Sequence, residues 1–257
     1  MLKGGKARAV LDPPRFNVLS LSPALWLDAS QINGLADGDP ISTWLDLSGF
    51  RRDATSAGAA RPTFKTNIVN GKPVARFDGV GTFMTPGNVL NFERTDLFSI
   101  FVVFQTAQAD RALISKLAAG STLRGWGFSV TSSGGENLLT TLSNDVGSNL
   151  YIQVRASVDV INASFWIGTL TYAGTSVASG VGFYTNGTLN TNTDVKDALG
   201  TNTMVHAGQV DIGARSGGIA DFFSGDIAEI IVVSRVLTAG ELNLVNRYLG
   251  KKYGIVA

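Results

Sequence analysis

Hydrophobic and polar positions alternate with a period of two along most of the chain from Ala24 onward. Such alternation is typical of a strand with one buried face, whereas a run that is apolar at every position is typical of a strand buried on both faces. The runs Phe98–Thr106 and Ile227–Val233 are of the second kind, so they predict two central strands. Further predicted strands lie within Val74–Phe77, Gly125–Val130, Asn149–Ala156, Phe165–Tyr172, Gly180–Leu189 and Val210–Arg215.

One turn between these strands has a specific signature. Asn186-Gly187 lies between two alternating runs, and this dipeptide is typical of the type I′ turn of a β-hairpin because both of its positions need positive φ. About a dozen strands in succession, without alternating helices, favour an all-β chain folded as an antiparallel β-sandwich.

The C-terminal segment changes to a helical pattern. Thr238 is followed three residues later by Glu241, which is the pattern of a capping box. The hydrophobic residues that follow at helical spacing are Leu242, Val245 and Leu249. We therefore expect one helix over about 239–250, ending near Gly250 and packed on the sandwich.

Composition supports the sandwich and narrows the possible partners. Only 16% of the 257 residues are charged and thirty are glycine, a mixture that suits short strands joined by many turns. The net charge of +1 provides no strong field, so we expect neither nucleic acid nor a membrane as a partner. The absence of cysteine excludes disulfides and thiolate metal sites.

Residues 1–22 differ from the rest, which we assign as one domain over 23–257. The first segment contains the pair Pro13-Pro14, which favours extended backbone, and it has no apolar run of the kind found in a secretory signal peptide. We interpret it as an extended arm outside the sandwich; the alternative is a disordered tail. The residues expected to make assembly contacts are Pro13, Pro14, Phe16 and Leu19.

Several segments carry a resemblance to a known family. They are, in order, LWLDAS, DGDPISTWLDLSG, RPTF, NGKPVARFDG, GWGF, VGFYTNG, DIGAR and FSGDIAEIIVVSRVLTAGELNLVNRYLGKKYG. Together they resemble the concanavalin A-like, laminin G-type jelly roll of phage virion and bacterial surface proteins, from about Ala24 to the C-terminus. The resemblance implies two curved antiparallel sheets with the C-terminal helix at their rim. It implies less about function, because this fold hosts lectins, glucanases, adhesion domains and spacers.

An acidic turn is the one candidate metal site. Asp37 and Asp39 alternate within a glycine-rich segment, and hard cations such as Ca²⁺ prefer such oxygens. A calcium site needs about six oxygen ligands, however, and Asp-Gly and Asp-Pro pairs are ordinary turn formers. We therefore expect turn contacts and no resident cofactor, with Ca²⁺ at this turn as the alternative.

The candidate catalytic acids do not match a glycosidase pattern. Asp226 and Glu229 are separated by an odd number of positions, which predicts opposite faces of a strand. They also differ from the closely spaced acids of related glucanases. His206 is the single histidine, and no nucleophile motif such as GxSxG accompanies it. We therefore expect no enzymatic activity.

Sugar binding is the remaining chemistry, since it needs an aromatic plate and planar polar groups. The candidate residues are Trp126, Tyr184, Asn186 and Arg215. Glycines on both sides of Trp126 would expose its ring, although the same flanks suit a closely packed core strand. The glycine-rich segments 132–136 and 216–221 are expected to line a shallow groove.

Three functional hypotheses follow from these patterns. The first is a non-enzymatic virion structural protein, such as a capsid decoration, tail or fibre component, on the virion surface. Its arm would contact other virion subunits or copies of itself, and its jelly roll would aid adhesion to glycans of the host surface. The alternative is a carbohydrate-binding module of a bacterial surface protein, located outside the cell or on its surface. The third is a glycan hydrolase.

Overall fold

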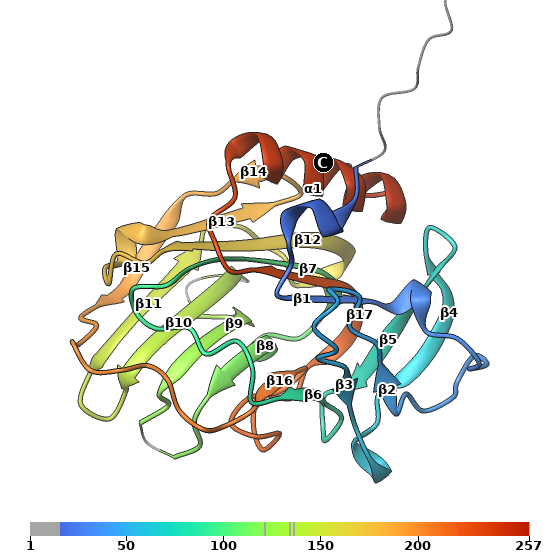
Figure 1. Ribbon diagram of the computed structural model, residues 1–257, viewed down its shortest axis with the longest axis horizontal. Coiled ribbons are helices and arrows are strands. Elements are labelled where there is room, and N and C mark those ends of the chain that lie inside the picture. Colours follow the sequence, from blue (N-terminus) through green and yellow to red (C-terminus); the bar gives the residue numbers. More distant parts are fainter. Residues whose placement is uncertain (1–15, 121, 134, 136, 257) are drawn as a thin grey trace, which may run out of the picture.

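The structure, a computed structural model, describes residues 16–120, 122–133, 135 and 137–256. Two antiparallel sheets lie face to face and one α-helix covers one of them, so the predicted β-sandwich jelly roll with a C-terminal helix is confirmed (Figure 1). Among the described residues, no helix combines the length and apolar character that crossing a bilayer requires.

The two sheets have separate strand orders. One has eight strands in the order β14-β13-β12-β7-β17-β5-β4, with β1 paired to β17. Its strands are β1 (Leu25–Asp28), β4 (Thr63–Val69), β5 (Lys72–Asp78), β7 (Leu97–Thr106), β12 (Asn162–Ala173), β13 (Val181–Thr185), β14 (Thr188–Leu189) and β17 (Ser224–Val233). The other has nine strands in the order β15-β11-β10-β9-β8-β16-β6-β3-β2. Its strands are β2 (Thr43–Trp44), β3 (Ala54–Thr55), β6 (Met84–Gly87), β8 (Arg111–Leu117), β9 (Gly125–Thr131), β10 (Asn137–Asp145), β11 (Leu150–Ala156), β15 (Asn192–Asp197) and β16 (Val210–Ile212).

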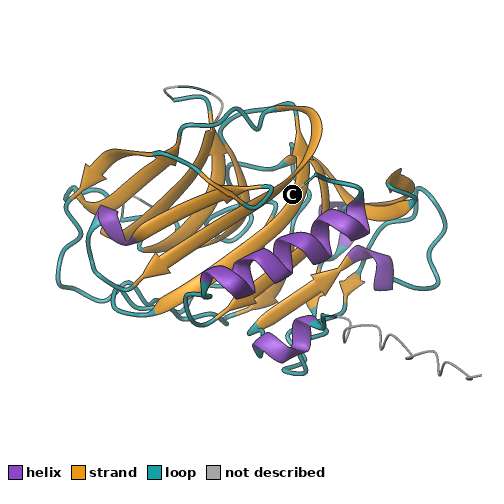
Figure 2. Ribbon diagram, turned by 90° about the horizontal axis from the view of Figure 1, so that it is seen from above, coloured by secondary structure: helices purple, strands orange, loops and turns teal. Residues whose placement is uncertain are grey.

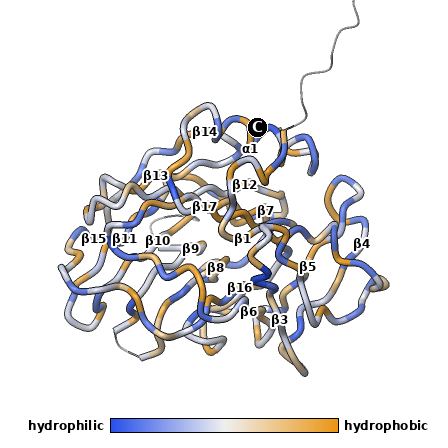
Figure 3. Tube along the Cα trace, in the orientation of Figure 1, coloured by the Kyte–Doolittle hydropathy of each residue, from blue (hydrophilic) through white to orange (hydrophobic). Residues whose placement is uncertain are grey.

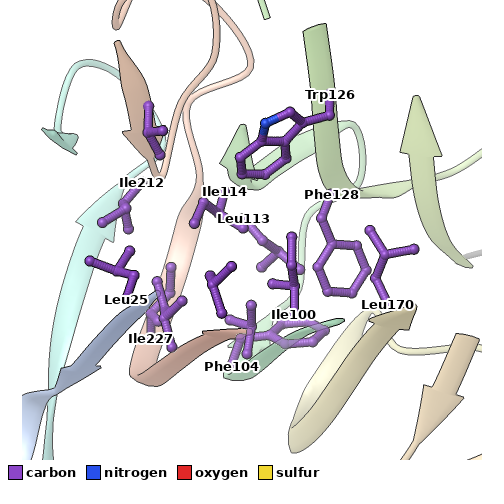
Figure 4. Close-up of a cluster of buried hydrophobic side chains, with 14 of the residues drawn as sticks. Leu25, Ile100, Phe104, Leu113, Ile114, Trp126, Phe128, Leu170, Ile212 and Ile227 are labelled. Atoms are coloured by element: carbon purple, nitrogen blue, oxygen red, sulfur yellow. The ribbon is translucent and has the colours of Figure 1, made fainter. Parts of the chain in front are cut away.

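The two strongly apolar runs form adjacent central strands, as predicted. Phe101 of β7 lies opposite Ile231 of β17 in the ladder, and both strands are buried on both faces. On β7, Ile100 and Phe104 face the core between the sheets, whereas Phe101 faces the core under the helix. Figure 3 colours each residue of the chain by its hydropathy, and Figure 4 shows side chains of the core between the sheets.

Helix α1 (Ala239–Tyr253) lies across the outer face of the eight-stranded sheet (Figure 2). Its predicted capping box is confirmed, because Thr238 Oγ1 accepts from the Glu241 amide and Glu241 Oε2 accepts from the Thr238 amide. The expected end at Gly250 is wrong by about one turn. The helix continues because Tyr253 is buried, and Gly254 ends it with φ of 68°.

The N-terminal boundary also differs from the prediction. Pro13 and Pro14 lie outside the described residues, but the chain from Phe16 onward is part of the folded domain. A 3₁₀ turn, η1 (Val18–Leu21), buries its first and last residues in the apolar cluster under α1. The Phe16 ring lies 5.9 Å from that of Tyr248, and Leu19 is exposed. The burial of Val18 and Leu21 therefore joins this turn to the sandwich. The remaining 3₁₀ turns are η2 (Ala29–Gln31), η3 (Gly58–Ala60) and η4 (Ala178–Gly180).

Candidate functional site

The outer face of the nine-stranded sheet carries a row of small and polar side chains. Ser115 of β8 lies opposite Gly127 of β9, Gly127 opposite Thr141 of β10, and Thr141 opposite Gln153 of β11. The sequence neighbours that face the core between the sheets are Ile114, Phe128, Leu142 and Ile152. Because successive residues of a strand point to opposite faces, the row faces away from the core.

This row forms the floor of a groove with a volume of about 250 Å³. Its polar lining residues are Ser115, Ser129, Thr141, Tyr151, Gln153, Arg215 and Asp221. Its apolar side chains include Leu117, Leu123, Leu139 and Val146. The groove therefore combines an aromatic ring, hydroxyls, an amide and one ion pair, which is the mixture that a small polar ligand requires.

Gly127 keeps the floor of the groove open. A Cβ at this position would lie 3.0 Å from Leu117 Cδ1 and 3.6 Å from Ser115 Cβ. Any larger side chain would project from the same floor and fill the space between β8 and β10. The missing side chain therefore leaves the floor of the groove open at this position.

The segment Arg215–Asp221 forms one end of the groove. The Arg215 amide donates to Ala220 O at 3.0 Å, and the Arg215 Nε–H donates to Asp221 Oδ2 in an ion pair. The two side chains are 27% and 41% exposed, so both reach the groove and solvent. The turn therefore presents a donor group and an acceptor group side by side.

A buried carboxylate fixes this turn in place. Asp211 Oδ2 accepts from the amides of Gly217 and Gly218 at 2.6 and 3.2 Å, and its Oδ1 accepts from Gln209 Nε2 at 2.6 Å. Burial raises the pKa of Asp211, while these hydrogen bonds and the nearby Lys116 act in the opposite direction. Gly217 and Gly218 both have positive φ, which explains why glycine is needed where the amides turn inward.

Strand β11 provides the opposite wall. Tyr151 and Gln153 alternate on its outer face, and Gln153 Nε2 donates to Thr141 Oγ1 at 3.3 Å. Lys196 Nζ of β15 lies 5.9 Å from the centre of the half-buried Tyr151 ring. In such an arrangement the aromatic face can pack against the apolar side of a sugar ring, and the amide can form hydrogen bonds with its hydroxyls.

Of the predicted sugar-binding residues, Arg215 lies in the groove and Trp126 does not. Trp126 is 1% exposed, and its indole N–H donates to Leu90 O at 3.1 Å (Figure 4). The flanking Gly125 serves close packing, because a Cβ there would lie 1.8 Å from Lys116 O. The ring therefore belongs to the core, and the prediction that it forms a binding plate is wrong.

Tyr184 and Asn186 lie on the other sheet. Asn186-Gly187 forms the predicted hairpin between β13 and β14 with positive φ at both positions, and Asn186 Oδ1 accepts from the Ile167 amide at 2.9 Å. Tyr184 is half-buried against the cluster under α1. Neither is brought together with Arg215.

The groove residues that the sequence prediction missed have only a weak signal. Tyr151 and Gln153 alternate with Ile152 and Val154 in the segment NLYIQVRA, which identifies an exposed strand face but no ligand. Of the two glycine-rich segments expected to line a groove, 216–221 reaches it through Asp221. Gly134 and Glu136 of the other segment lie outside the described residues.

The acidic turn makes ordinary turn contacts. Asp37 forms an ion pair with Lys65 and accepts from the Thr66 amide at 2.8 Å, and Asp39 Oδ2 accepts from the Ala36 amide at 2.7 Å. The Lys65 hydrogen bond is the main reason that the pKa of Asp37 is lowered. Within the described ranges, no group of three histidine or acidic side chains is arranged to hold a metal ion.

Asp226 and Glu229 face the same side of β17, contrary to the prediction. Ile227 pairs with Phe104 and Glu229 with Val103, so Ala228 is an extra residue in a β-bulge. Both carboxylates lie on the eight-stranded sheet, away from the groove, and both are engaged. Asp226 accepts hydrogen bonds from Nε and Nη2 of Arg76 at 2.7 and 2.8 Å. Glu229 is bonded to Lys252 of α1 at 2.6 Å.

His206 has a structural position. Its Nδ1 accepts from the Gly208 amide at 3.0 Å, so its Nε2–H is the donor to Lys116 O at 3.2 Å. Burial lowers the pKa of His206, because the charged imidazolium is disfavoured there. The ring therefore bridges the segment before β16 to β8.

Two solved toxin structures of low sequence identity share this fold. The botulinum neurotoxin serotype D binding domain has a TM-score of 0.59 and 14% identity, over 90% of this chain and 53% of that one. The binding domain of Paraclostridial Mosquitocidal Protein 1 has a TM-score of 0.57 and 13% identity, over 89% and 53%. The Ruminococcus gnavus IT-sialidase CBM40 has a TM-score of 0.49 and 19% identity, over 67% and 96%. The chain thus spans about half the length of the two toxin structures, and the likeness shows the fold alone. No family model and no curated sequence matches the chain.

Proposed function

We propose that the protein is a non-enzymatic, lectin-like binding module that holds a glycan in the groove on the nine-stranded sheet. One observation carries the proposal: the outer face of this sheet gathers Tyr151, Gln153 and the Arg215–Asp221 pair around a floor opened by Gly127. A sugar needs an apolar surface for its C–H face and fixed donors and acceptors for its hydroxyls. The groove offers both.

The size of the groove suits a small ligand. Its volume of about 250 Å³ is slightly below the range for small-molecule sites, roughly 300–1,000 Å³. We therefore propose that it takes about one sugar ring, with any further residues of the glycan directed into solvent. Binding of a terminal sugar in this way is weak for a single site and gains strength when several modules act together.

The charged groups of the groove favour binding over hydrolysis. A glycosidase uses two carboxyl groups about 5–9.5 Å apart. Among the described residues that line the groove, Asp221 is the only carboxylate, and it is held by Arg215. The two toxin structures of similar fold are themselves named binding domains, which supports the same class of function.

We further propose that the module is displayed on a virion surface and aids adhesion to the host. The chain enters the described structure at Phe16, beside α1 on the eight-stranded sheet, and the groove lies on the other sheet. Attachment through residues 1–15 to other virion subunits, or to copies of the same chain, leaves the groove free to meet a glycan. A carbohydrate-binding module of a bacterial surface protein is the alternative setting, and the same geometry serves it.

A glycan array tests the binding proposal directly. The wild type is compared with Gln153→Ala, which removes the groove amide, and with Tyr151→Ala, which removes the ring. Tyr184→Ala is the matched control, since it removes a half-buried tyrosine from the other sheet. We expect bound glycans for the wild type and Tyr184→Ala and their loss in both groove variants. An array without bound glycans, or equal signals from all four proteins, would refute the proposal.

A further inference from the structure

We infer that Asp221 makes the groove select uncharged sugars over acidic ones, because it already occupies the guanidinium of Arg215. This inference rests on the proposed glycan binding and names the class of sugar. Arg215 and Asp221 are the only charged side chains among the described lining residues. Their mutual ion pair leaves the groove with no net charge of its own.

The side-on fork of the Arg215 guanidinium, formed by Nε and the adjacent Nη2, is not free for an incoming carboxylate because Asp221 occupies Nε. Its Nε–H donates to Asp221 Oδ2, and its Nη1 donates to Ser216 Oγ at 3.3 Å. A carboxylate binds arginine best through two parallel hydrogen bonds. An acidic sugar would have to displace Asp221 from Nε or bind the remaining Nη donors end-on, and in either position it would lie beside a second negative charge.

Uncharged hydroxyls meet no such penalty. A sugar hydroxyl both donates and accepts, so neighbouring hydroxyls can donate to Asp221 and accept from Arg215 without separating the pair. Each of these contacts includes one charged partner, which makes it stronger than a hydrogen bond between neutral groups. The partial exposure of both side chains, 27% and 41%, leaves them within reach of the ligand.

The pair is held by its backbone and does not depend on side-chain attraction alone. The Arg215 amide is bonded to Ala220 O, and the Ala112 amide of β8 donates to Asp221 O at 2.9 Å. The buried Asp211 carboxylate accepts hydrogen bonds from the amides of Gly217 and Gly218, which lie between Arg215 and Asp221 in the turn. The backbone that carries the two side chains is therefore fixed before a ligand arrives.

One other cation lies close to the groove. Lys196 is placed over the Tyr151 ring at the edge formed by β15, and it is not part of the groove lining. If Lys196 governs selectivity instead, acidic sugars will bind the wild type well and Lys196→Ala will remove that binding. This variant therefore belongs in the experiment.

The test uses Asp221→Asn in the full chain. Asp221 has φ of 50°, and asparagine adopts this left-handed region readily, so the turn is retained while the charge is lost. Asp37→Asn is the matched control. Asp37 is also a partly exposed aspartate in an ion pair, with 46% of its side chain exposed, and its replacement changes the net charge equally.

The probes are two pairs of sugars that differ only at C6: galactose with galacturonic acid, and glucose with glucuronic acid. Dissociation constants come from NMR titration of each variant. We expect the wild type and Asp37→Asn to bind the neutral member of at least one pair more tightly. In Asp221→Asn the preference should shift toward the acidic member by about tenfold, the effect of freeing one charge-assisted hydrogen bond.

Three results would overturn the inference: a wild type that prefers the acidic sugar, an unchanged ratio in Asp221→Asn, or an equal shift in Asp37→Asn. In each of them sugars still bind, so the proposed glycan binding survives. If none of the four sugars binds the wild type or Asp221→Asn, and the glycan array also shows no bound glycan, both proposals fail together. The two failures are thereby distinguished.

Discussion

Lys252 Nζ lies 2.6 Å from Glu229 Oε2, which places a cation of helix α1 against a fully buried carboxylate of strand β17. A second carboxylate, Asp28 of β1, lies 2.5 Å from the same ammonium. The other donors to Glu229 are Trp26 Nε1, Tyr248 OH and Tyr253 OH. Burial, followed by the neighbouring Asp28, raises the pKa of Glu229. The helix is therefore held on the sheet by a buried polar network as well as by apolar contacts.

The first prediction concerns this network. Lys252→Met leaves the buried Glu229 and Asp28 without their cation, and breaking a buried ion pair costs about 3–5 kcal/mol. We expect a loss of this size in the free energy of unfolding, measured by urea denaturation. Lys251→Met is the matched control, since Lys251 is exposed on the same turn and its replacement should change stability by about 0.5 kcal/mol or less. Equal losses in the two variants would contradict this account.

The second prediction tests where the domain begins. Leu21 is buried under α1, whereas Leu19 of the same 3₁₀ turn is exposed. Leu21→Ala should lower the free energy of unfolding by about 2–5 kcal/mol, and Leu19→Ala by about 0.5 kcal/mol or less. Thermal unfolding of both variants and of chains 16–257 and 23–257 checks this. If chain 23–257 were as stable as chain 16–257, residues 16–22 would not contribute to the folded domain and would belong to the arm.

The third prediction concerns assembly through residues 1–15. If this segment contacts other subunits or copies of the chain, the full-length protein should be larger in solution than the chain 16–257. Light scattering of both proteins measures the mass directly. We expect an oligomer for the full chain and a folded monomer after truncation. Two monomers would count against self-assembly through the arm and would favour the setting of a single binding module.

The fourth prediction is a dependence of stability on pH. The Arg235 hydrogen bond, followed by the Thr238 amide, lowers the pKa of Glu241 to about 2. Because this pKa is below that of the unfolded chain, about 4.3, the contribution of Glu241 to stability is present above pH 4.3. It is lost as the pH falls toward 2. In Glu241→Gln, the free energy of unfolding should therefore change less between pH 4.5 and 2.5. Parallel curves for the two proteins would contradict this.

The sequence predicted the central architecture because its strongest patterns are local. The runs that became β7 and β17, the Asn186-Gly187 hairpin and the Thr238–Glu241 capping box each depend on nearby residues. Strands β8 and β10 are among those that were missed. Lysine, serine and threonine interrupt their apolar positions, and the structure pairs these strands through the neighbouring β9.

The groove was less predictable because its residues meet only through tertiary packing. Gly127 and Gln153 come from different strands, and Asp221 comes from a turn held by Asp211. The sequence around Trp126 did not distinguish a buried ring from an exposed one, because its flanking glycines suit both. The burial of Trp126 and the close approach of Gly125 to the backbone of Lys116 show that this glycine serves packing. The bulge at Ala228 likewise has no local signature, and it reverses the expected facing of Asp226 and Glu229.

The most direct test of the central proposal is an NMR titration of the full chain with the strongest glycan from the array. The account predicts that the largest amide shifts fall on β8 to β11 around Gly127, Thr141 and Gln153, and on the turn from Arg215 to Asp221. Shifts centred instead on the eight-stranded sheet around Tyr184 would show that the glycan binds elsewhere, and the groove would then have no role in binding.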